Sequence, residues 1–499
     1  MFAKFKFPSP LSILMFIIVI AAITTWLMPA GSYDKLEYNK EKTFILHKPN
    51  NTFALPATQQ TLDSLHIKLS ISKFENEDIR KPISVPGTYK KQGANRQSVL
   101  DILKAPLRGI YETIDIILLI LVIGGFIAVF YESGAMEKGV VFLSQKMKGK
   151  ENWFIITLTF LFVLGGSSYG MAEEALAFYP ILVPLFLVAG YDLLIPVAVI
   201  FLGTQIGTLS SITNPFSTII ASNAAGINWT EGITGRVIML FVSSVITIIY
   251  IVRYANKIKK EPSQSLVKKI DGDIISPFPV IIQQTVIISL DKKTIAILIL
   301  FLTTFIMMVS GVIFWGWWLL EMTTVFLASS ILLAIILRMH EKIFIEKFIK
   351  GAESLLSVAF IVGIARGVSI ILNEGQISDS ILFYSANMVE GLPNGIFIVI
   401  ILILFMFFTL FISSTSGMAV LTMPIMGSLA VVAGIPGEEM VNAYLYGMGI
   451  MGIITPTGLM LPSLAMVNIS LKTFLKFVLP LMLILIIVSA LFLIIGVLF

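Results

Sequence analysis

The stretch GGSSYGMAEEA (165–175) interrupts an apolar region that runs from residue 153 to residue 223, and SSITNP (210–215) interrupts it again. The apolar pieces between these interruptions are too short for ordinary spanning helices, which need about 20 residues. Backbone inside a membrane leaves the helical conformation only where protein or a water-filled cavity satisfies its polar groups. The pattern therefore predicts a re-entrant hairpin followed by a broken helix, with Gly-, Ser- and Thr-rich points near the middle of the bilayer.

The same order of features returns near the C-terminus. There, ISSTSGMA (412–419), a turn at 434–436 and GIITPTG (452–458) follow one another within an apolar region. Gly-Met-Ala occurs in both copies. Paired interruptions in two halves of a chain are the best sequence indication of a transporter's binding site. We therefore expect two repeats with a binding site between them.

Composition indicates a polytopic membrane protein. Of the 499 residues, 57% are hydrophobic and 13% are charged, and the mean hydropathy is +0.92. Soluble proteins contain about 25% charged residues. The net charge of +5 comes from Lys and Arg in loops beside apolar runs, which favours a role in membrane topology over nucleic-acid binding. The chain has no cysteine, so disulfides, thiolate metal sites and a cysteine nucleophile are excluded.

The hydropathy and the positions of helix-breaking residues predict an all-α polytopic membrane protein. We expect two inverted repeats with two re-entrant hairpins, two broken helices and about nine transmembrane helices. Because the first apolar run exceeds the about 7–15 residues of a signal-peptide core, we expect an uncleaved first helix. The expected parts are a first transmembrane helix (1–31), an extracytoplasmic polar segment (32–105), the remainder of repeat 1 (106–252, with hairpin 153–189 and broken helix 193–223), a cytoplasmic basic loop (253–293), a connector helix (294–314) and repeat 2 (317–499, with hairpin 395–433 and broken helix 439–468).

The distribution of basic residues predicts the orientation. Cytoplasmic loops carry an excess of Lys and Arg. With the N-terminus inside, the four basic loops at 132–152, 253–293, 338–352 and 469–476 all fall inside. The short loops that then fall outside contain no Lys or Arg, although Arg236 follows one of them closely. This layout places the C-terminus outside and makes the two repeats inverted.

Polar residues at the interruptions are the candidate substrate-binding residues. A helix N-terminus offers free N–H groups and partial positive charge to an anionic group. Ser and Thr hydroxyls add donors and acceptors, although in membrane helices they also bond local backbone or allow close packing. The candidates are Ser167, Ser168, Tyr169, Thr213, Asn214, Ser413, Ser414, Thr415, Ser416, Thr455 and Thr457.

Unwound carbonyls at the two breaks are hard oxygen ligands of the kind that hold Na⁺ in transporters. A possible Na⁺ site lies near Ser167, Ser211, Asn214, Ser414 and Thr455. Either Na⁺ or H⁺ is the expected coupling ion, and no other cofactor is expected.

Glu173 and Glu174 follow the first tip directly, and the second copy has no acid there. An intramembrane carboxylate is costly and marks function by default. It binds a substrate ammonium, accepts a coupling proton or completes a Na⁺ shell. Alternatively, one of the pair faces water or caps the start of the return arm, where a carboxylate is favourable. The sequence does not distinguish which acid faces the site.

Arg366, in VGIARG (362–367), is predicted to lie well inside a helix. It is a candidate for binding a substrate carboxylate or for neutralising a buried acid. The sequence does not decide between these roles.

Other function classes are disfavoured. The chain has no phosphate-binding loop ending in GK[ST], and its three histidines have no metal-ligand spacing. Glu173 and Glu174 are the sole candidate catalytic pair, and adjacent residues on a helix do not face each other. We therefore expect a transporter and no enzyme, with an ion channel as the less favoured alternative.

Four motifs resemble the YfcC-type transporters, which are grouped with the DcuC class of four-carbon dicarboxylate carriers in the ion-transporter superfamily. They are PAGSY (29–33), VPGTY (85–89), GGSSYGMAEEALAFYPI (165–181) and the SSTSGMA…TPTG half (413–458). The resemblance covers nearly the whole chain. Relatives often have Ser-Asn-Thr at the hairpin tips, whereas here the tips read Ser-Ser-Tyr (167–169) and Ser-Ser-Thr (413–415). This difference leaves Na⁺ coupling open.

The resemblance implies a secondary active transporter in the bacterial cytoplasmic (inner) membrane. It also implies a homodimer with a scaffold and an elevator-like moving region. We expect the hairpins and broken helices to move and the remaining helices to form the scaffold. Members of the class are labelled as basic amino-acid antiporters or as dicarboxylate carriers, so a small carboxylate-bearing solute is expected, with an amino acid first and a four-carbon diacid as the alternative.

Overall fold

The computed structural model describes most of the chain, and the fold below refers to these residues. The described ranges are 10–39, 43–48, 51–67, 71–75, 82–147, 149–168, 170–225, 227–272, 278, 290–315, 317–389 and 392–498. Most of these residues are helical.

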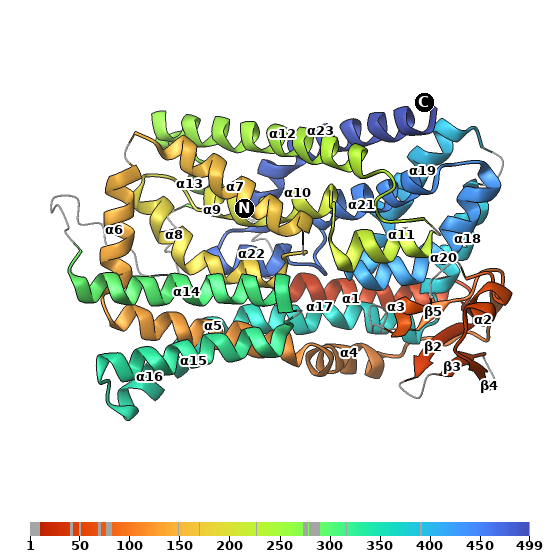
Figure 1. Cartoon of the computed structure of the whole chain (residues 1–499), viewed down its shortest axis with the longest axis horizontal. Coiled ribbons are helices and arrows are strands. Elements are labelled where there is room, and N and C mark those ends of the chain that lie inside the picture. Colours follow the sequence, from red (N-terminus) through yellow and green to blue (C-terminus); the bar gives the residue numbers. More distant parts are fainter. Residues whose placement is uncertain are drawn as a thin grey trace, which may run out of the picture.

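The helices form three layers, which Figure 1 shows from the side. Two long helices lie at the top, short and interrupted helices fill the middle, and long helices lie at the bottom. A group of short strands lies at the right-hand end in this view, and the C-terminus lies toward the same end.

Small residues allow the helices of the lower layer to approach closely. A Cβ on Gly109 would lie 2.1 Å from the carbonyl oxygen of Gly363, and one on Gly124 would lie 2.4 Å from that of Gly351. Such contacts replace the hydrophobic effect as the cause of helix association in lipid. The layer contains α1 (Pro10–Leu27), α4 (Val99–Glu112), α5 (Ile114–Glu132), α14 (Lys292–Trp315), α15 (Leu319–Leu337), α16 (Glu341–Ser354) and α17 (Leu356–Glu374).

The middle layer contains the interrupted segments that the sequence singles out. In the first half these are α7 (Glu151–Ser168), η1 (Glu173–Phe178), α8 (Tyr179–Val188), α9 (Leu194–Val197), η2 (Ala198–Leu202), α10 (Gly203–Leu209), η3 (Pro215–Ile219) and α11 (Ile220–Ala224). In the second half they are α19 (Asn394–Phe411), α20 (Thr415–Ala433), α21 (Gly437–Gly452) and α22 (Met460–Val467). No described helix crosses 210–214 or 453–459, so both broken helices are interrupted at their polar motifs.

The upper layer consists of α12 (Ile233–Lys260) and α23 (Leu471–Leu498). A short segment with η4 (Pro262–Gln264) and α13 (Leu266–Ile270) ties these helices to the middle layer. The Asp192 carboxylate accepts hydrogen bonds from the hydroxyls of Tyr254 and Ser265, both at 2.6 Å. The Asp271 carboxylate accepts one from Thr473 at 2.7 Å. Burial raises the pKa of Asp192, and these donors oppose that rise.

Six of the described helices are long and apolar enough to cross a membrane, namely α5, α12, α15, α17, α19 and α23. Their outer surfaces are apolar, as lipid contact requires. The protein is therefore membrane-embedded with several spans, and the count of about nine spans stays a prediction.

The prediction of an all-α protein is wrong for the polar segment after α1. This segment contains a four-stranded antiparallel sheet in the order β4-β3-β2-β5 and a β1–β6 pair. Leu36 pairs with Leu46, and both are buried with Phe44 beneath α2 and α3. The strands were overlooked because they are short and lie among polar residues. They are β1 (Gly31–Ser32), β2 (Lys35–Asn39), β3 (Thr43–His47), β4 (Thr52–Pro56), β5 (Ile83–Ser84) and β6 (Lys90–Lys91), with α2 (Gln59–Ser64) and α3 (Ser72–Glu75).

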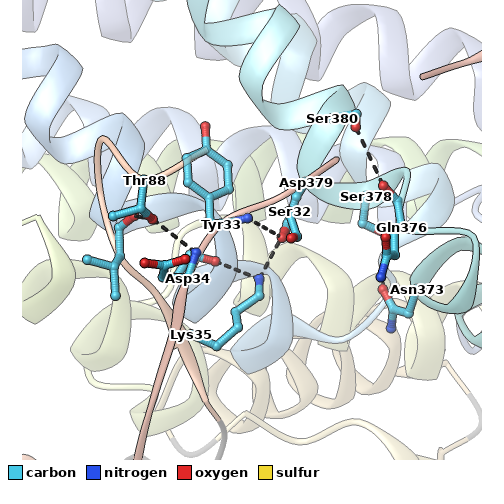
Figure 2. A network of polar contacts seen from close by, with 12 residues as sticks. Ser32, Tyr33, Asp34, Lys35, Thr88, Asn373, Gln376, Ser378, Asp379 and Ser380 are labelled. Atoms are coloured by element: carbon cyan, nitrogen blue, oxygen red, sulfur yellow. Dashed lines mark hydrogen bonds and ion pairs between the residues drawn. The ribbon is translucent and has the colours of Figure 1, made fainter. Parts of the chain in front are cut away.

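This small domain docks on α18 (Ser378–Val389), as Figure 2 shows. The Asp379 carboxylate accepts a hydrogen bond from the Tyr33 backbone N–H and pairs with the Lys35 ammonium, both at 3.0 Å. The Tyr89 ring stacks on Phe383 with ring centroids 4.0 Å apart. Strand β5 also contacts α20. The domain therefore contacts both the end of the lower layer and an arm of the middle layer.

Replacing Asp379 with alanine should detach this domain. The change leaves the Tyr33 N–H without its acceptor and the Lys35 ammonium with Ser84 alone, and we expect a loss of about 2–3 kcal/mol in the free energy of unfolding. Thermal unfolding of the purified protein measures the change. Asp63→Ala, which removes an exposed carboxylate of the same domain, is the matched control and should change the melting temperature little. Equal melting temperatures for the two variants would contradict the docking described above.

Candidate functional site

The first tip forms where α7 ends at two glycines and two serines. After Ser168 the chain turns back, so that the Met171 N–H donates to the Gly165 carbonyl oxygen at 3.1 Å. Gly170 has φ +81°, a conformation that favours glycine. A Cβ on Gly170 would also lie 2.7 Å from the Asn214 side chain. The sequence therefore requires glycine at this position for two reasons.

The first tip and the first break hold each other through the backbone. The Ser167 carbonyl oxygen accepts hydrogen bonds from the N–H groups of Ile212 and Thr213, both at 3.2 Å. The Thr213 hydroxyl donates to the Ser168 carbonyl oxygen at 3.0 Å. These contacts satisfy backbone groups that the interruption frees from the helix, as membrane depth requires.

Asn214 completes this contact. Its side-chain amide donates to the Gly166 carbonyl oxygen at 3.3 Å, and its oxygen accepts from the Phe216 N–H at 2.8 Å, which caps η3. Asn214 is buried, whereas the Ser168 and Thr213 side chains are exposed. Polar surface therefore remains at the joined tip and break.

Two glycines bring α7 and α10 together beneath the tip. A Cβ on Gly166 would lie 2.3 Å from the Thr204 carbonyl oxygen, and one on Gly207 would lie 2.2 Å from the Val163 carbonyl oxygen. The corresponding contact in the second half joins α19 and α21, where a Cβ on Gly447 would lie 2.9 Å from the Leu402 carbonyl oxygen. Gly207 and Gly447 lie within apolar helices and not in the polar motifs, and they allow each helix that ends at a tip to pack closely on its broken helix.

The second tip is joined to its broken helix by a tyrosine. The Tyr444 hydroxyl of α21 donates to the Thr415 carbonyl oxygen at 2.9 Å. The Ser414 hydroxyl accepts from the Gly417 N–H at 3.2 Å and so caps α20. Ser413 and Ser416 flank these residues and are half-buried. Helix α20 therefore begins at the second tip, with its positive end there.

The second break carries Thr455 and Thr457, and both side chains are buried. The Thr455 hydroxyl donates to the Met451 carbonyl oxygen at 2.8 Å, and the Thr457 hydroxyl donates to that of Leu410 at 3.4 Å. Thr457 therefore joins the break to the end of α19, just before the second tip.

The two halves are in contact through α10 and α21. A Cβ on Gly449 would lie 2.3 Å from Leu209 Cα, and one on Gly452 would lie 2.5 Å from the Gln205 amide nitrogen. In addition, α20 contacts η3 and α11. The arm that leaves the second tip therefore lies beside the first break.

The two glutamates have different surroundings. Glu174 is buried, and its carboxylate accepts a hydrogen bond from the Ala172 N–H, just before η1, at 2.9 Å. Glu173 is half-buried and lies close enough to Asp115 of α5 for an electrostatic interaction. Glu173 thus faces the contact between the middle and lower layers. Asp115 was not recognised from the sequence, because nothing in the sequence places α5 beside the first tip.

Arg366 lies on the face of α17 that packs against α4. Its Nε donates to the Glu112 carboxylate at 2.7 Å, and a second pair, Arg108 with Glu374, joins the same two helices. Arg366 thus pairs with an acid, but Glu112 is exposed, so this contact differs from the neutralisation of a buried acid that the sequence suggested. The described contacts do not join Arg366 to either tip.

The structure brings some of the predicted site residues together. Ser167, Ser168, Thr213 and Asn214 form the first cluster, with Ser211 beside them. Thr415, Ser414 and Thr457 lie along the second tip and its arms. Tyr169 lies outside the described residues. Ser217 and Thr218, which the sequence analysis did not select, bond the Ser211 hydroxyl at 3.4 and 2.6 Å.

The predicted Na⁺ site is divided between the two halves. Ser167, Ser211 and Asn214 lie together at the first break, whereas Ser414 and Thr455 belong to the second half. In the described residues, the Ser167 carbonyl oxygen already accepts from two N–H groups and from the Ser211 hydroxyl. A cation at the first break would therefore have to displace existing hydrogen bonds.

Long apolar helices around interrupted, polar segments define a polytopic membrane protein with its candidate site inside the membrane. The chain belongs to the C4-dicarboxylate anaerobic carrier family, DcuC, whose sequence model matches residues 7–498. The resemblance noted from the motifs is thereby confirmed.

Two relatives match nearly the whole chain. An uncharacterised protein of Haemophilus influenzae is 40% identical over 99% of this chain and 97% of its own length. A putative basic amino acid antiporter of Escherichia coli, YfcC, is 27% identical over 95% of this chain and 93% of its own length.

Among solved structures, the YdaH transporter of Alcanivorax borkumensis aligns with 98% of this chain and 98% of its own at 14% identity and a TM-score of 0.40. The MtrF efflux pump of Neisseria gonorrhoeae aligns with 99% and 96% at 15% identity and a TM-score of 0.38. Likeness at this level supports no conclusion about this chain.

Proposed function

We propose that this protein is a secondary active transporter, a symporter or antiporter of the elevator-like kind, for a small carboxylate-bearing solute. The observation that carries the proposal is the joined first tip and break, where Ser168 and Thr213 stay exposed beside buried, bonded backbone. The start of α20 offers N–H groups and partial positive charge for a carboxylate.

We propose that the two halves are inverted repeats. In each half, a helix that ends at a tip packs on a broken helix through a glycine, Gly207 in the first and Gly447 in the second. A long helix, α12 or α23, follows each broken helix. Equivalent packing in the same chain order supports the repeat and the re-entrant hairpins.

The proposed moving unit includes α12 and α23 and is therefore larger than the hairpins and broken helices alone, which the sequence predicts to move. Both helices pack on the middle layer and on each other, and they lie on the side opposite the lower layer. Moving the middle layer without them would expose buried residues such as Ser243 and Ser489. We propose that the lower layer is the scaffold and forms a homodimer.

For the solute, an amino acid is the first candidate. Its carboxylate would bind at the tips and its ammonium would bind beside Glu173. Among the described residues, Glu173 has no ion-pair partner. Arg366 is occupied by Glu112, which disfavours it as the second anchor of a diacid. The family description favours a four-carbon dicarboxylate as the second candidate. The name of YfcC supports a basic amino acid and exchange.

The proposed location is the bacterial cytoplasmic membrane, with the N-terminus inside and the small β domain and the C-terminus outside. The basic loops support this orientation. The end of α23 and the strands lie toward the same end of the molecule, in agreement with it.

Thermal unfolding with candidate solutes tests the proposal. A ligand that binds the native state raises the melting temperature, with about 2.7 kcal/mol of stabilisation at a hundredfold excess over Kd. We expect arginine, lysine or ornithine to stabilise the purified protein, each tested with and without Na⁺. Stabilisation by succinate alone would favour the dicarboxylate carrier instead.

Flux into liposomes separates the transporter from the other classes. We expect saturable uptake that internal solute accelerates. Unsaturable flux with single-channel currents would indicate a channel, and chemical conversion of the solute would indicate an enzyme.

A further inference from the structure

A second polar cluster lies at the start of α21, at the opposite end of this helix from Gly452 and the break. It consists of Arg236 of α12 with Glu438, Glu439 and Asn442 of α21, and we call it the outer cluster. Arg236 is 0% exposed and Asn442 is 2% exposed. The two glutamates are half-buried.

Two glycines show how closely the outer cluster is enclosed. A Cβ on Gly496 of α23 would lie 2.3 Å from the Glu439 carboxyl oxygen. A Cβ on Gly232, just before α12, would lie 2.8 Å from Glu438 Cβ and 3.4 Å from Arg236 Nη1. Three helices, α12, α21 and α23, therefore meet at the outer cluster.

Arg236 is only partly paired. Its Nη2 donates to the carbonyl oxygens of Glu231, at 2.9 Å, and Trp229. Its Nε and Nη1 are buried and have no hydrogen-bond partner among the described residues. A guanidinium stays protonated in proteins, and a buried cation requires an anion nearby. Glu438 and Glu439 both lie close enough to Arg236 for an electrostatic interaction, so these two acids can provide the anion.

Asn442 indicates the protonation state of the other acid. The Asn442 side chain lies within reach of the Glu439 carboxyl group, but its buried Oδ1 has no donor among the described residues. A carboxylate cannot supply a donor, whereas a protonated carboxyl group can. A proton on Glu439 would therefore let the acid and the amide form two hydrogen bonds.

The charges of the outer cluster also favour a protonated Glu439. Two ionised carboxylates and one guanidinium leave the outer cluster with an excess negative charge, which one proton removes. Helices α10, α11, α19 and α20 and the segment η3 contain no ionisable side chain, and the lysines of α23 lie near its start, at the other end from Gly496. Glu231, before α12, carries a further carboxylate, which is exposed and accepts a hydrogen bond from the Asn228 N–H. Tyr446 of α21 also faces Arg236.

We propose that Glu439 binds the proton that drives transport, in a site shared with Arg236, Glu438 and Asn442 and separate from the solute site. The inference rests on the proposed transport function. The proton comes from the outer aqueous phase and adds to the carboxylate, and the same O–H bond breaks when the proton leaves. Tyr444, on the same helix, bonds the second tip, so α21 connects proton binding to the solute site.

Uptake into liposomes under a pH gradient tests the coupling. For one proton per solute, the accumulation ratio of the wild type should change about tenfold per pH unit. Glu439→Gln, which carries a permanently neutral side chain of the same shape, should make this ratio independent of the gradient. A tenfold response in Glu439→Gln would overturn the proposal. Glu353→Gln, which removes an exposed acid on α16, is the matched control and should respond like the wild type.

Infrared spectroscopy of the purified full chain tests proton binding without transport. A carboxylic-acid band should be lost between about pH 5 and about pH 8 in the wild type, above the ordinary range of a glutamate. The part of this band that comes from Glu439 should be missing from the spectrum of Glu439→Gln. Glu439→Asp should keep the band at a shifted frequency. A band that is unchanged in both variants would overturn the proposal.

The two measurements separate the possible failures. Absence of any saturable uptake by the wild type would refute the proposed transport function, and the infrared band would still decide whether Glu439 binds a proton. If Glu439→Gln does not fold, as judged by gel filtration, Glu439→Asp decides the proposal through the shift of its band.

Discussion

Replacing Gly207 with alanine is expected to prevent α7 and α10 from packing. The new Cβ would lie 2.2 Å from the Val163 carbonyl oxygen and 2.8 Å from the Ser167 backbone nitrogen, and neither backbone atom can rotate away. The helices must separate, which also breaks the bonds from Ile212 and Thr213 to Ser167. Overpacking together with these losses should cost about 4 kcal/mol or more, a large part of the stability of a typical protein.

The measurement is the melting temperature and the fraction of monodisperse protein after purification. Gly235→Ala in α12 is the matched control, because a Cβ there meets nothing within 4 Å. Alanine is favoured over glycine within a helix by about 0.5–1 kcal/mol, so this control should match or exceed the wild type in stability. If Gly207→Ala melts like the wild type, the close approach of α7 and α10 is wrong.

Replacing Glu173 with glutamine is expected to abolish most transport while leaving the protein folded. Glu173 lies near Glu174 and Asp115 and has no ion-pair partner among the described residues, so its carboxyl group can bind a solute ammonium. Loss of a charged hydrogen bond should raise the activation free energy of uptake by about 3 kcal/mol, which lowers the uptake rate more than a hundredfold. Initial uptake rates in liposomes, normalised to reconstituted protein, give the value.

Glu174→Gln provides the comparison. The side-chain amide of glutamine still has an oxygen that can accept the Ala172 N–H, so this hydrogen bond is retained and uptake should fall less than tenfold. Equal losses in the two variants would show that both acids act in transport. Normal uptake in both would exclude the role proposed for Glu173.

The sequence predicts the class of protein and the location of its interruptions well, because both follow from local patterns. Length and hydropathy identify a membrane protein, and polar motifs such as SSITNP mark where helices must break. The joining of Ser167 to Thr213 follows from the same reasoning. These residues lie within one hairpin and broken helix, so the chain connection itself brings them close together.

Contacts between distant segments were not predictable in this way. The sequence left Arg366 with two candidate roles, binding a solute carboxylate or neutralising a buried acid. Its partner, Glu112, lies far away in the sequence, at the end of a helix that was not anticipated there. Arg236 appeared only as an exception to the charge rule. Its relation to Glu438 and Glu439 depends on how α12 packs against α21, which no local pattern encodes. The small β-sheet was missed because its strands are short and mostly polar.

The meeting of Arg236 with α21 also has a consequence for biosynthesis. Helix α12 enters the membrane long before the ribosome has made the residues after 436, and until then Arg236 has neither acid beside it. Arg236 is the fourth residue of α12, so the cost of leaving it unpaired is below the about 2.5–3.5 kcal/mol of an arginine at the centre of a membrane helix. The first half of the chain is therefore synthesised before the residues that Arg236 contacts exist. A nascent chain arrested before residue 437 should be a preferred target of membrane quality control.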